Sequence, residues 1–452
     1  MKNKILLISV AAVVAISLIV AGCGAPGEPE VVIGMSRPQS GPLFGIAAGA
    51  ADAIHPPFLA LLNAGGGILK SGKYFPVVTD IRDDASTDSL MIKHTGDIIN
   101  DIANGDIHAL WGSCGTHMTF VQAPIANAGQ TVLISFEGGA TQLKDDPIRL
   151  PIYPYVFISL SFSDWHQLPE AAPALYAAHA AYNVSDPCTA YLVCQDDDHG
   201  LEYATTANAT FGANNITVLG QTDIVHVAGF NYAAVVTTIQ GANPDIVCLF
   251  CYPDEQLGVL NAAISVSYNT PKAWVCGPGA NFGWFGVYNQ TSPMVPYAGL
   301  GIQAEDVMCF AVANNQTLPW LFDTVLVPPP IPGMTIELED YWGHPLYWAS
   351  MEVWEDCMTA AGTYDAVNNL FVIDQDDLKD QLAAYNGTTI LGDTWYTLFG
   401  SPTPTDGGGI IAWECHMGQF GQWKNGYVEI VVGKNTTDTI DYPKVKWDGS
   451  PY

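Results

Sequence analysis

Short apolar runs rich in β-branched residues alternate along this chain with longer helical stretches, and a glycine-rich or polar turn follows nearly every run. Residues 107–115 (IHALWGSCG) are typical of a strand and its turn. Residues 119–129 (TFVQAPIANAG) are typical of a helix that stops at glycine, and residues 130–141 (QTVLISFEGGAT) of the next strand and turn. This alternation predicts βαβ units, which assemble into an open, mostly parallel sheet covered by helices.

The same pattern restarts near Trp165, with further strands and turns at residues 188–200, 245–255 and 272–284. With 452 residues, the chain is too long for one ordinary core and suits two domains. The predicted fold class is therefore α/β, with two doubly wound, Rossmann-like lobes in series.

Ligands of open α/β sheets bind beyond the carboxyl ends of the strands. In this chain those ends carry the turns SGPLFG, GSCGTH, EGGAT, DDDHG, YPDE and GPGANF. Turns from two lobes can face each other across a cleft, so these segments are the candidate binding site.

The charge balance excludes several kinds of partner. Acidic residues number 45 and basic residues 15, which gives a formal net charge of -30. So few cations leave no basic patch for nucleic acid, and none to hold the body of the protein on an anionic membrane.

The N-terminus carries an export signal. A basic start, MKNK, precedes an apolar run at residues 5–20. The last residue of this run begins the sequence VAGC, which ends at Cys23. This arrangement is typical of a secretory signal, and its ending resembles a bacterial lipobox, in which Cys23 becomes the lipidated first residue. The alternative is a plain membrane anchor of marginal length. We predict a signal peptide at 1–23, a tether at 24–30, and a body lipid-anchored to the outer face of the cell membrane.

Several segments resemble type I periplasmic binding proteins of the branched-chain amino acid class. The likeness runs from about residue 31 to residue 432 and rests on the order and spacing of the segments rather than on one motif. The segments that carry it are residues 33–45, 61–68, 77–88, 110–135, 190–203, 243–263, 341–363 and 417–426.

The resemblance implies two lobes joined by a three-segment hinge that close on a small solute. Lobe 1 would comprise residues 31–157 plus about 305–385, and lobe 2 residues 158–304 plus about 386–435. It also implies a substrate-binding lipoprotein that delivers its solute to the permease and ATPase subunits of an ABC importer. No Walker-type GxxxxGK[ST] motif occurs in this chain, so those subunits would be separate chains.

The resemblance also implies a set of ligand-binding residues. Backbone N–H groups and hydroxyls at two turns would hold a carboxylate, since such groups suit an anion. The residues carried over for this role are Ser113, Cys114, Thr116, Gly139, Ala140 and Thr141. At one position where the family has an aromatic contact the candidates are Phe44 and Ile46, and at another this chain has His199. Tyr252, at the end of a strand, is a further candidate.

One position departs from the family pattern. Amino-acid-binding members place an acid after the last Gly-Pro of the second lobe to meet the ammonium group, but this chain has Gly279 there. Asp254 or Glu255 could replace that acid. The predicted solute is therefore carboxylate-bearing or amide-like, either an amino acid or an aromatic or aliphatic acid.

The run Asp196–Asp198 followed by His199 allows three interpretations. A metal site needs three or more converging ligands, and an acid–base pair needs a nucleophile within reach. The sequence has no HExxH, calcium-loop or GxSxG motif. We favour a solvated rim that caps a helix beginning near Leu201, and we expect no metal, no cofactor and no catalysis.

Two other functions fit the same fold. A sensor would report the solute to a signalling partner, and a structural surface protein would bind no small solute. An enzyme would need turnover that disappears when His199 is replaced.

Overall fold

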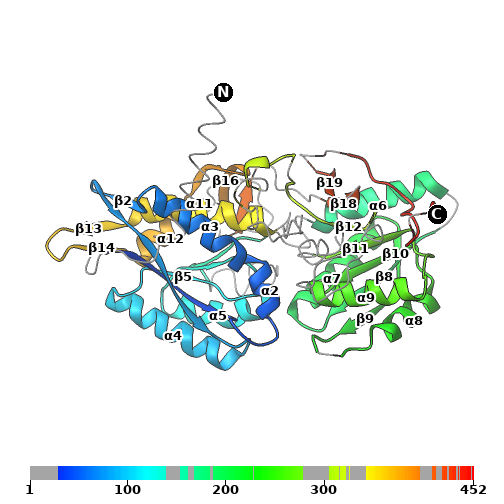
Figure 1. Cartoon of the computed structure of the whole chain (residues 1–452), viewed down its shortest axis with the longest axis horizontal. Helices are drawn as coiled ribbons and strands as arrows, with labels where there is room; N and C mark the ends of the chain where they lie inside the picture. The colour runs from blue at the N-terminus through cyan, green and yellow to red at the C-terminus, as the bar shows by residue number, and fades with distance from the viewer. Residues whose placement is uncertain are drawn as a thin grey trace, which may run out of the picture.

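The computed structural model consists of two α/β lobes that lie side by side (Figure 1). It describes residues 29–138, 153–160, 167–183, 187–227, 229–277, 305–314, 316–321, 325, 343–397, 410–413, 420–424, 427–433, 436, 438–448 and 450–452. The predicted signal peptide with Cys23, most of the tether, and Gly139, Ala140, Thr141 and Gly279 lie outside these residues.

The first lobe is built on an eight-stranded sheet with the order β15-β16-β17-β7-β6-β5-β1-β4. Its parallel strands are β1 (Val31–Arg37), β4 (Val77–Asp83), β5 (Ala109–Trp111), β6 (Leu133–Ser135) and β7 (Val156–Ile158). The strands β15 (Asn386–Thr389), β16 (Gly392–Thr397) and β17 (Ile410–Trp413) extend it. Its helices are α2 (Phe44–Gly49), α3 (Ala51–Ala64), α4 (Asp88–Asn104), α5 (Thr116–Ala128), α11 (Gly343–Ala361) and α12 (Gln375–Ala383). Two hairpins pair β2 (Ile68–Lys70) with β3 (Lys73–Phe75) and β13 (Thr363–Asp365) with β14 (Leu370–Val372).

Alternating side chains of β5 show how this sheet is covered on both faces. Trp111 packs edge-on against Trp354 of α11, with ring centroids 5.2 Å apart. Leu110 points the other way and belongs to a buried cluster with Ile98 of α4 and Ala123 of α5. A strand buried on both faces reads as a continuous apolar run, as the sequence of β5 does.

The second lobe has a seven-stranded sheet with the order β19-β18-β12-β11-β10-β8-β9. Its strands are β8 (Cys188–Gln195), β9 (Ile216–Ile224), β10 (Ile246–Phe250), β11 (Ala273–Cys276), β12 (Met308–Phe310), β18 (Phe420–Lys424) and β19 (Tyr427–Val432). The first five are parallel, whereas β18 runs antiparallel to β12 and to β19. Its helices are α6 (Leu168–Asn183), α7 (Asp198–Ala213), α8 (Tyr232–Ala242) and α9 (Pro253–Ser265).

The chain passes between the two sheets after β7, between β12 and α11, and between β17 and β18. The two-lobed α/β class is therefore confirmed, but the lobe boundaries near the C-terminus need correction. The prediction placed residues 305–385 in lobe 1 and 386–435 in lobe 2. In the structure β12 pairs in the second sheet, and β15, β16 and β17 pair in the first. These strands are short, and their lobe is decided by the strand they pair with rather than by their own sequence.

Candidate functional site

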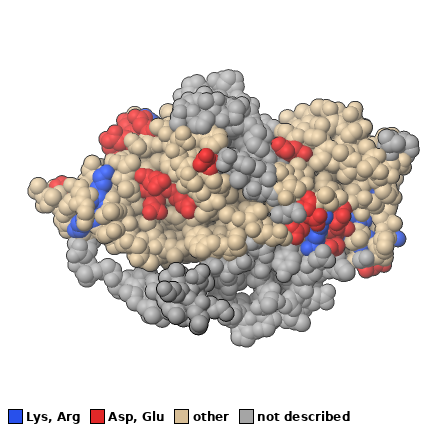
Figure 2. Space-filling model, turned by 90° about the horizontal axis from the view of Figure 1, so that it is seen from above, with Lys and Arg blue, Asp and Glu red and all other residues tan. Residues whose placement is uncertain are grey.

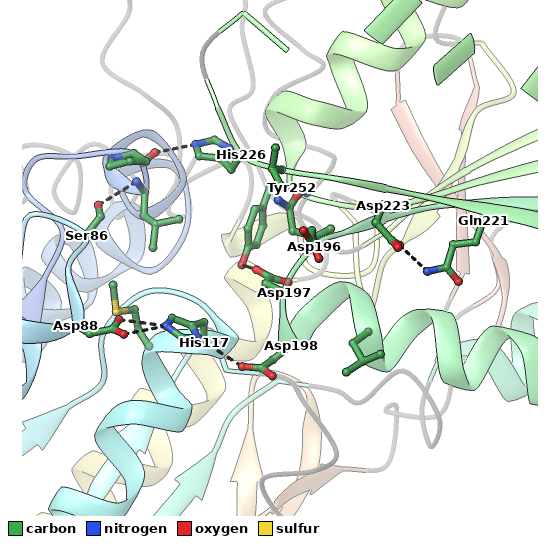
Figure 3. A pocket seen from close by; sticks show the side chains of 16 residues that line it. Ser86, Asp88, His117, Asp196, Asp197, Asp198, Gln221, Asp223, His226 and Tyr252 are labelled. Atoms are coloured by element: carbon green, nitrogen blue, oxygen red, sulfur yellow. Dashed lines mark hydrogen bonds and ion pairs between the residues drawn. The ribbon is translucent and has the colours of Figure 1, made fainter. Parts of the chain in front are cut away.

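A cleft of about 680 Å³ lies between the lobes, at the carboxyl ends of the central strands. From the first lobe it is lined by Pro42, Leu43, Ser86, Asp88, His117 and Met118. From the second lobe its polar lining includes Asp196, Asp197, Asp198, Asp223, His226 and Tyr252 (Figure 3). Two of the predicted turns, GSCGTH and DDDHG, therefore do face each other across one cavity.

The N-terminus of α5 forms part of the first-lobe wall. Gly115 precedes the helix with a φ of 87°, a left-handed conformation that favours glycine. No side chain caps this helix, and its first turn contains no acidic residue. The positive end of α5 is therefore not neutralised by its own side chains, and His117 and Met118 of its first turn line the cleft.

Ser113 and Cys114 lie in the interior of the first lobe, just before this helix. The Ser113 hydroxyl donates to Asp84 Oδ2 at 2.8 Å, and its backbone N–H donates to Gln122 Oε1 at 3.0 Å. Burial raises the pKa of the Cys114 thiol well above its ordinary value. Both donors of Ser113 are thus engaged within the lobe, and neither residue lines the cleft. As ligand-binding residues they remain predictions.

The predicted residues Thr116 and Phe44 also lie outside the cleft lining. Thr116 is the first residue of α5 and is buried, whereas Phe44 begins α2 and is 46% exposed. Tyr252 is therefore the one predicted ligand residue, among those the structure describes, that lines the cleft.

The three aspartates of DDDHG occupy different positions around the start of α7. Asp197 is the N-cap, and its Oδ1 accepts from the backbone N–H of Gly200 at 3.1 Å. Asp198 is the first residue of the helix, and Asp196 is exposed at the rim. The capping interpretation is confirmed for Asp197, although the helix begins three residues earlier than Leu201.

Tyr252 and Asp197 meet at the second-lobe wall. The Tyr252 hydroxyl donates to Asp197 Oδ2 at 2.7 Å. Desolvation, reinforced by the negative charge of Asp197, raises the pKa of the Tyr252 phenol well above its ordinary value. The phenol therefore stays protonated at neutral pH and keeps both side chains in a fixed orientation.

His199 lies behind Tyr252 and does not line the cleft. Its ring stacks on that of Tyr252, with centroids 5.5 Å apart and an interplanar angle of 15°, and tilts against Tyr203 at 4.9 Å. Desolvation lowers the pKa of His199, and the charge of Asp197 only partly opposes this effect. A neutral imidazole packed among aromatic rings supports Tyr252 from behind.

Glu255 is one of the two acids predicted to replace the missing partner of an ammonium group, but its carboxylate contacts His226 instead. It is 1% exposed, and its Oε1 makes a short contact with Nδ1 of His226. The other ring nitrogen of His226, Nε2, donates to the carbonyl oxygen of Pro42 in the first lobe at 3.1 Å. Asp254 is partly exposed in the first turn of α9 and does not line the cleft.

Sequence reasoning missed His226, Asp223 and His117 as cleft residues. His226 and Asp223 stand at the carboxyl end of β9, a strand end that carries no glycine-rich turn and so was not among the candidate segments. His117 lies inside a candidate turn, GSCGTH, for which the prediction named only hydroxyls and backbone N–H groups as binding groups.

A buried ion pair fixes the first-lobe turns behind the cleft. The guanidinium of Arg37, at the end of β1, donates to both carboxylate oxygens of Glu137, at 2.9 and 3.0 Å. Burial opposes the charge of Arg37, but Glu137 and then Asp52 outweigh it and raise the pKa of Arg37. This bidentate pair connects the end of β1 with the turn after β6.

In the described part of the chain, no three His, Cys, Asp or Glu side chains gather in a way that would hold a metal ion. Over the same residues, no helix combines the length and the apolar character needed to cross a membrane.

The fold and the cleft define a two-lobed α/β protein of the kind that binds a ligand between its sheets. A family model described as periplasmic binding protein matches residues 30–281, more than half of the chain. The protein belongs to this family, and the predicted type I class is confirmed. No curated protein sequence matches the chain.

Several solved structures are similar to this one. A solute-binding protein of an ABC transporter from Rhodopseudomonas palustris BisB5, in complex with 3,4-dihydroxybenzoic acid, superposes with a TM-score of 0.63 at 12% identity, covering 92% of this chain and 99% of that chain. The branched-chain amino acid transporter substrate-binding protein LivJ from Streptococcus pneumoniae, in complex with isoleucine, gives 0.61 at 14% identity, covering 89% and 99%. A solute-binding protein from R. palustris in complex with benzoate gives 0.62 at 14%, covering 91% and 98%.

Proposed function

We propose that this protein is an extracytoplasmic receptor that captures an amino acid between its lobes and delivers it to an ABC importer. The observation that carries the proposal is a single cleft that combines an uncapped helix N-terminus with a group of carboxylates. The first lobe contributes the uncapped N-terminus of α5, and the second lobe contributes a group of carboxylates.

The α5 end of the cleft suits the solute carboxylate. The first backbone N–H groups of a helix have no partner within the helix, and the helix dipole adds positive potential there. The first turn of α5 contains no acidic residue, so an incoming carboxylate would meet no repulsion from the side chains of this turn itself.

The second-lobe wall suits the solute ammonium group. Asp196, Asp197, Asp198 and Asp223 line it, and no lysine or arginine appears among the described residues of the cleft lining. The molecule as a whole is also strongly acidic, and on the face shown in Figure 2 acidic side chains gather in several clusters. These aspartates would supply the charge that Gly279 does not.

The size of the cleft agrees with a small solute. A volume of about 680 Å³ falls within the range of about 300–1,000 Å³ that is usual for small-molecule sites. The similar structures hold isoleucine, benzoate and dihydroxybenzoic acid. An aromatic acid without an amine is the second candidate solute, and it would use the α5 end alone.

The N-terminal sequence supports the remaining parts of the proposal. Export, followed by lipidation of Cys23, would hold the receptor at the outer face of the cell membrane, close to the permease. The permease and the ATPase would be separate chains. The proposal includes no catalytic step, no cofactor and no metal.

A thermal-shift panel tests the proposal. It compares leucine and isoleucine with 4-methylpentanoate, which lacks the amine, with isopentylamine, which lacks the carboxylate, and with benzoate and 3,4-dihydroxybenzoate. A solute present at 100 times its Kd should add about 2.7 kcal/mol to the free energy of unfolding and raise Tm measurably.

The outcomes separate the alternatives. A response to the amino acids that is lost with both truncated analogues supports a two-ended site. A response to the aromatic acids alone would replace the amino acid by an aromatic carboxylate. No response across the panel would contradict a receptor for amino acids or simple acids and favour a structural surface protein.

A further inference from the structure

Two histidines bridge the rim of the cleft, one from each lobe. His117 belongs to α5 of the first lobe, and its Nε2 lies 3.1 Å from Oδ1 of Asp88 in the same lobe. Its other ring nitrogen, Nδ1, lies 3.4 Å from Oδ2 of Asp198 in the second lobe (Figure 3).

The second histidine repeats this arrangement from the opposite side. His226 follows β9 of the second lobe, and its Nδ1 contacts the Glu255 carboxylate of its own lobe. Its Nε2 donates to the backbone carbonyl of Pro42 in the first lobe at 3.1 Å. Each histidine is thus anchored to a carboxylate of its own lobe and reaches an acceptor on the other lobe.

The number of protons decides whether both contacts of a histidine are hydrogen bonds. A neutral imidazole has one N–H, whereas the imidazolium has two. At His117 both nitrogens face carboxylate oxygens, so both contacts are satisfied only in the imidazolium. At His226 the carbonyl of Pro42 can only accept, so the Nδ1 contact needs a second proton, carried by the ring or by Glu255. The closed arrangement therefore holds protons that the separated lobes do not require.

We propose that His117 and His226 form a proton-dependent latch, through which closure of the two lobes is coupled to proton uptake. The role of the latch in solute capture rests on the proposed function, because closure is the step that encloses the solute. The receptor would close more readily, and bind its solute more tightly, at mildly acidic than at alkaline pH.

Acidic side chains face both rings. His117 faces Asp88 from α4 and Asp198 from α7. His226 faces Glu255 and Asp254 from α9, and the ring of Tyr252 lies edge-on at 6.2 Å. In the part of the chain that the structure describes, no lysine or arginine contacts either ring.

The direction of the effect follows from the contacts of His226. Its hydrogen bond with Glu255 raises its pKa, burial opposes this, and the hydrogen bond with Pro42 raises it further. The Pro42 contact exists only when the lobes meet, so this hydrogen bond acts to raise the pKa of His226 in the closed state alone. The stabilisation of the closed state is complete below the open-state pKa and is lost as pH rises through the closed-state pKa.

The two histidines contribute unequally. The side chain of His226 is 22% exposed and that of Glu255 only 2%, whereas those of His117 and Asp198 are 47% and 39% exposed. Solvent screens the more exposed pair. Most of the proton coupling should therefore come from His226.

The test measures lobe separation without any solute. Spin labels are attached to Val367→Cys in the first lobe and Val266→Cys in the second, two exposed positions, in the detergent-solubilised full chain. The cysteines that the structure describes are buried, and protein without the added cysteines serves as the labelling control. Pulsed electron paramagnetic resonance then gives the distance distribution from pH 6 to pH 9.

We expect the short-distance population to fall as pH rises, with the closed-to-open ratio changing by up to about tenfold per pH unit for each proton taken up. His226→Gln should remove most of this dependence. His117→Gln, and Asp198→Asn as a milder change at an exposed site, should reduce it. His94→Gln, on α4 and outside the cleft lining, should leave it unchanged.

Distances that do not vary with pH in the unaltered chain would overturn the latch, and so would a dependence that survives His117→Gln/His226→Gln. Titration with isoleucine at pH 6 and pH 9 separates the latch from the proposed function. Isoleucine binding with pH-independent distances rejects the latch alone. Proton-dependent distances without binding of any compound in the solute panel reject the proposed function alone.

Discussion

The hydroxyl of Tyr252 donates to Asp197 Oδ2 at 2.7 Å, and these two residues are the N-caps of α9 and α7, the helices that follow the adjacent strands β10 and β8. Asp197 also accepts from the backbone N–H of Gly200. One carboxylate therefore satisfies the start of α7 and orients the tyrosine that lines the cleft. The stability of the second lobe and the shape of its binding wall are linked through this side chain.

Replacing Asp197 with alanine should destabilise the second lobe. The change removes a helix cap and leaves the Tyr252 hydroxyl without its acceptor, so we expect a loss of about 1–2 kcal/mol in the free energy of unfolding by urea. Asp196→Ala, at the exposed neighbouring position, is the matched control and should change stability by less than about 0.5 kcal/mol. Equal losses in the two variants would contradict the capping role.

Two glycines of α7 should respond in opposite directions to alanine. A Cβ at Gly200 would lie 1.9 Å from the carbonyl oxygen of Gln195, so Gly200→Ala must displace backbone at the end of β8. At Gly212 nothing lies within 4 Å, and Gly212→Ala should stabilise the helix by up to about 1 kcal/mol because alanine loses less backbone entropy on folding. Thermal unfolding of both variants measures the two changes in Tm. A stabilised Gly200→Ala variant would contradict the expected clash between the new Cβ and the carbonyl oxygen of Gln195.

Much of the architecture could be predicted because it depends on local patterns. The continuous apolar runs of β8 and β10, each followed by polar turns, identify buried parallel strands. The cap of α7 follows from an aspartate placed just before a helical stretch. The positions of β12 and β15 could not be obtained in this way, because residues far away in the sequence decide which sheet a short strand joins.

The cleft was predictable in outline but not in detail. The strand-end rule located GSCGTH and DDDHG, yet the contacts between them join residues that are distant in the sequence. His117 and Asp198 are 81 positions apart, and His226 and Pro42 are 184 apart. The hydrogen bond from Ser113 to Asp84 could not be predicted for the same reason. The sequence of a turn does not show whether a serine hydroxyl faces the cleft or the core.

Breaking the buried pair of Arg37 and Glu137 should be among the most damaging changes in the first lobe. Their side chains are 0% and 5% exposed, so Arg37→Met leaves a carboxylate buried without its partner. We expect a loss of about 3–5 kcal/mol in the free energy of unfolding. Lys93→Met, at an ion pair with Asp97 whose side chains are 64% and 45% exposed, should cost less than about 1 kcal/mol. Guanidinium unfolding of both variants measures the difference. Similar losses would show that the stability of the protein depends no more on the buried ion pair than on the exposed one.

Two histidines of the second lobe should shape the pH dependence of stability with opposite signs. Desolvation lowers the pKa of folded His199 below the value of about 6.5 expected in the unfolded chain. Its neutral form therefore contributes stability above pH 6.5, which is lost as pH falls towards the folded pKa. His226 is the reverse case: its hydrogen bond with Glu255 raises its pKa, so its contribution is complete below about pH 6.5 and is lost as pH rises through the folded pKa.

His199→Phe keeps a ring stacked on Tyr252 and should flatten the acid side of the stability profile, by at most about 1.4 kcal/mol per pH unit. His226→Gln should instead lower stability on the acid side. Urea unfolding of both variants between pH 5 and pH 9 measures these profiles, and a shift in the same direction for both would contradict the assigned protonation states.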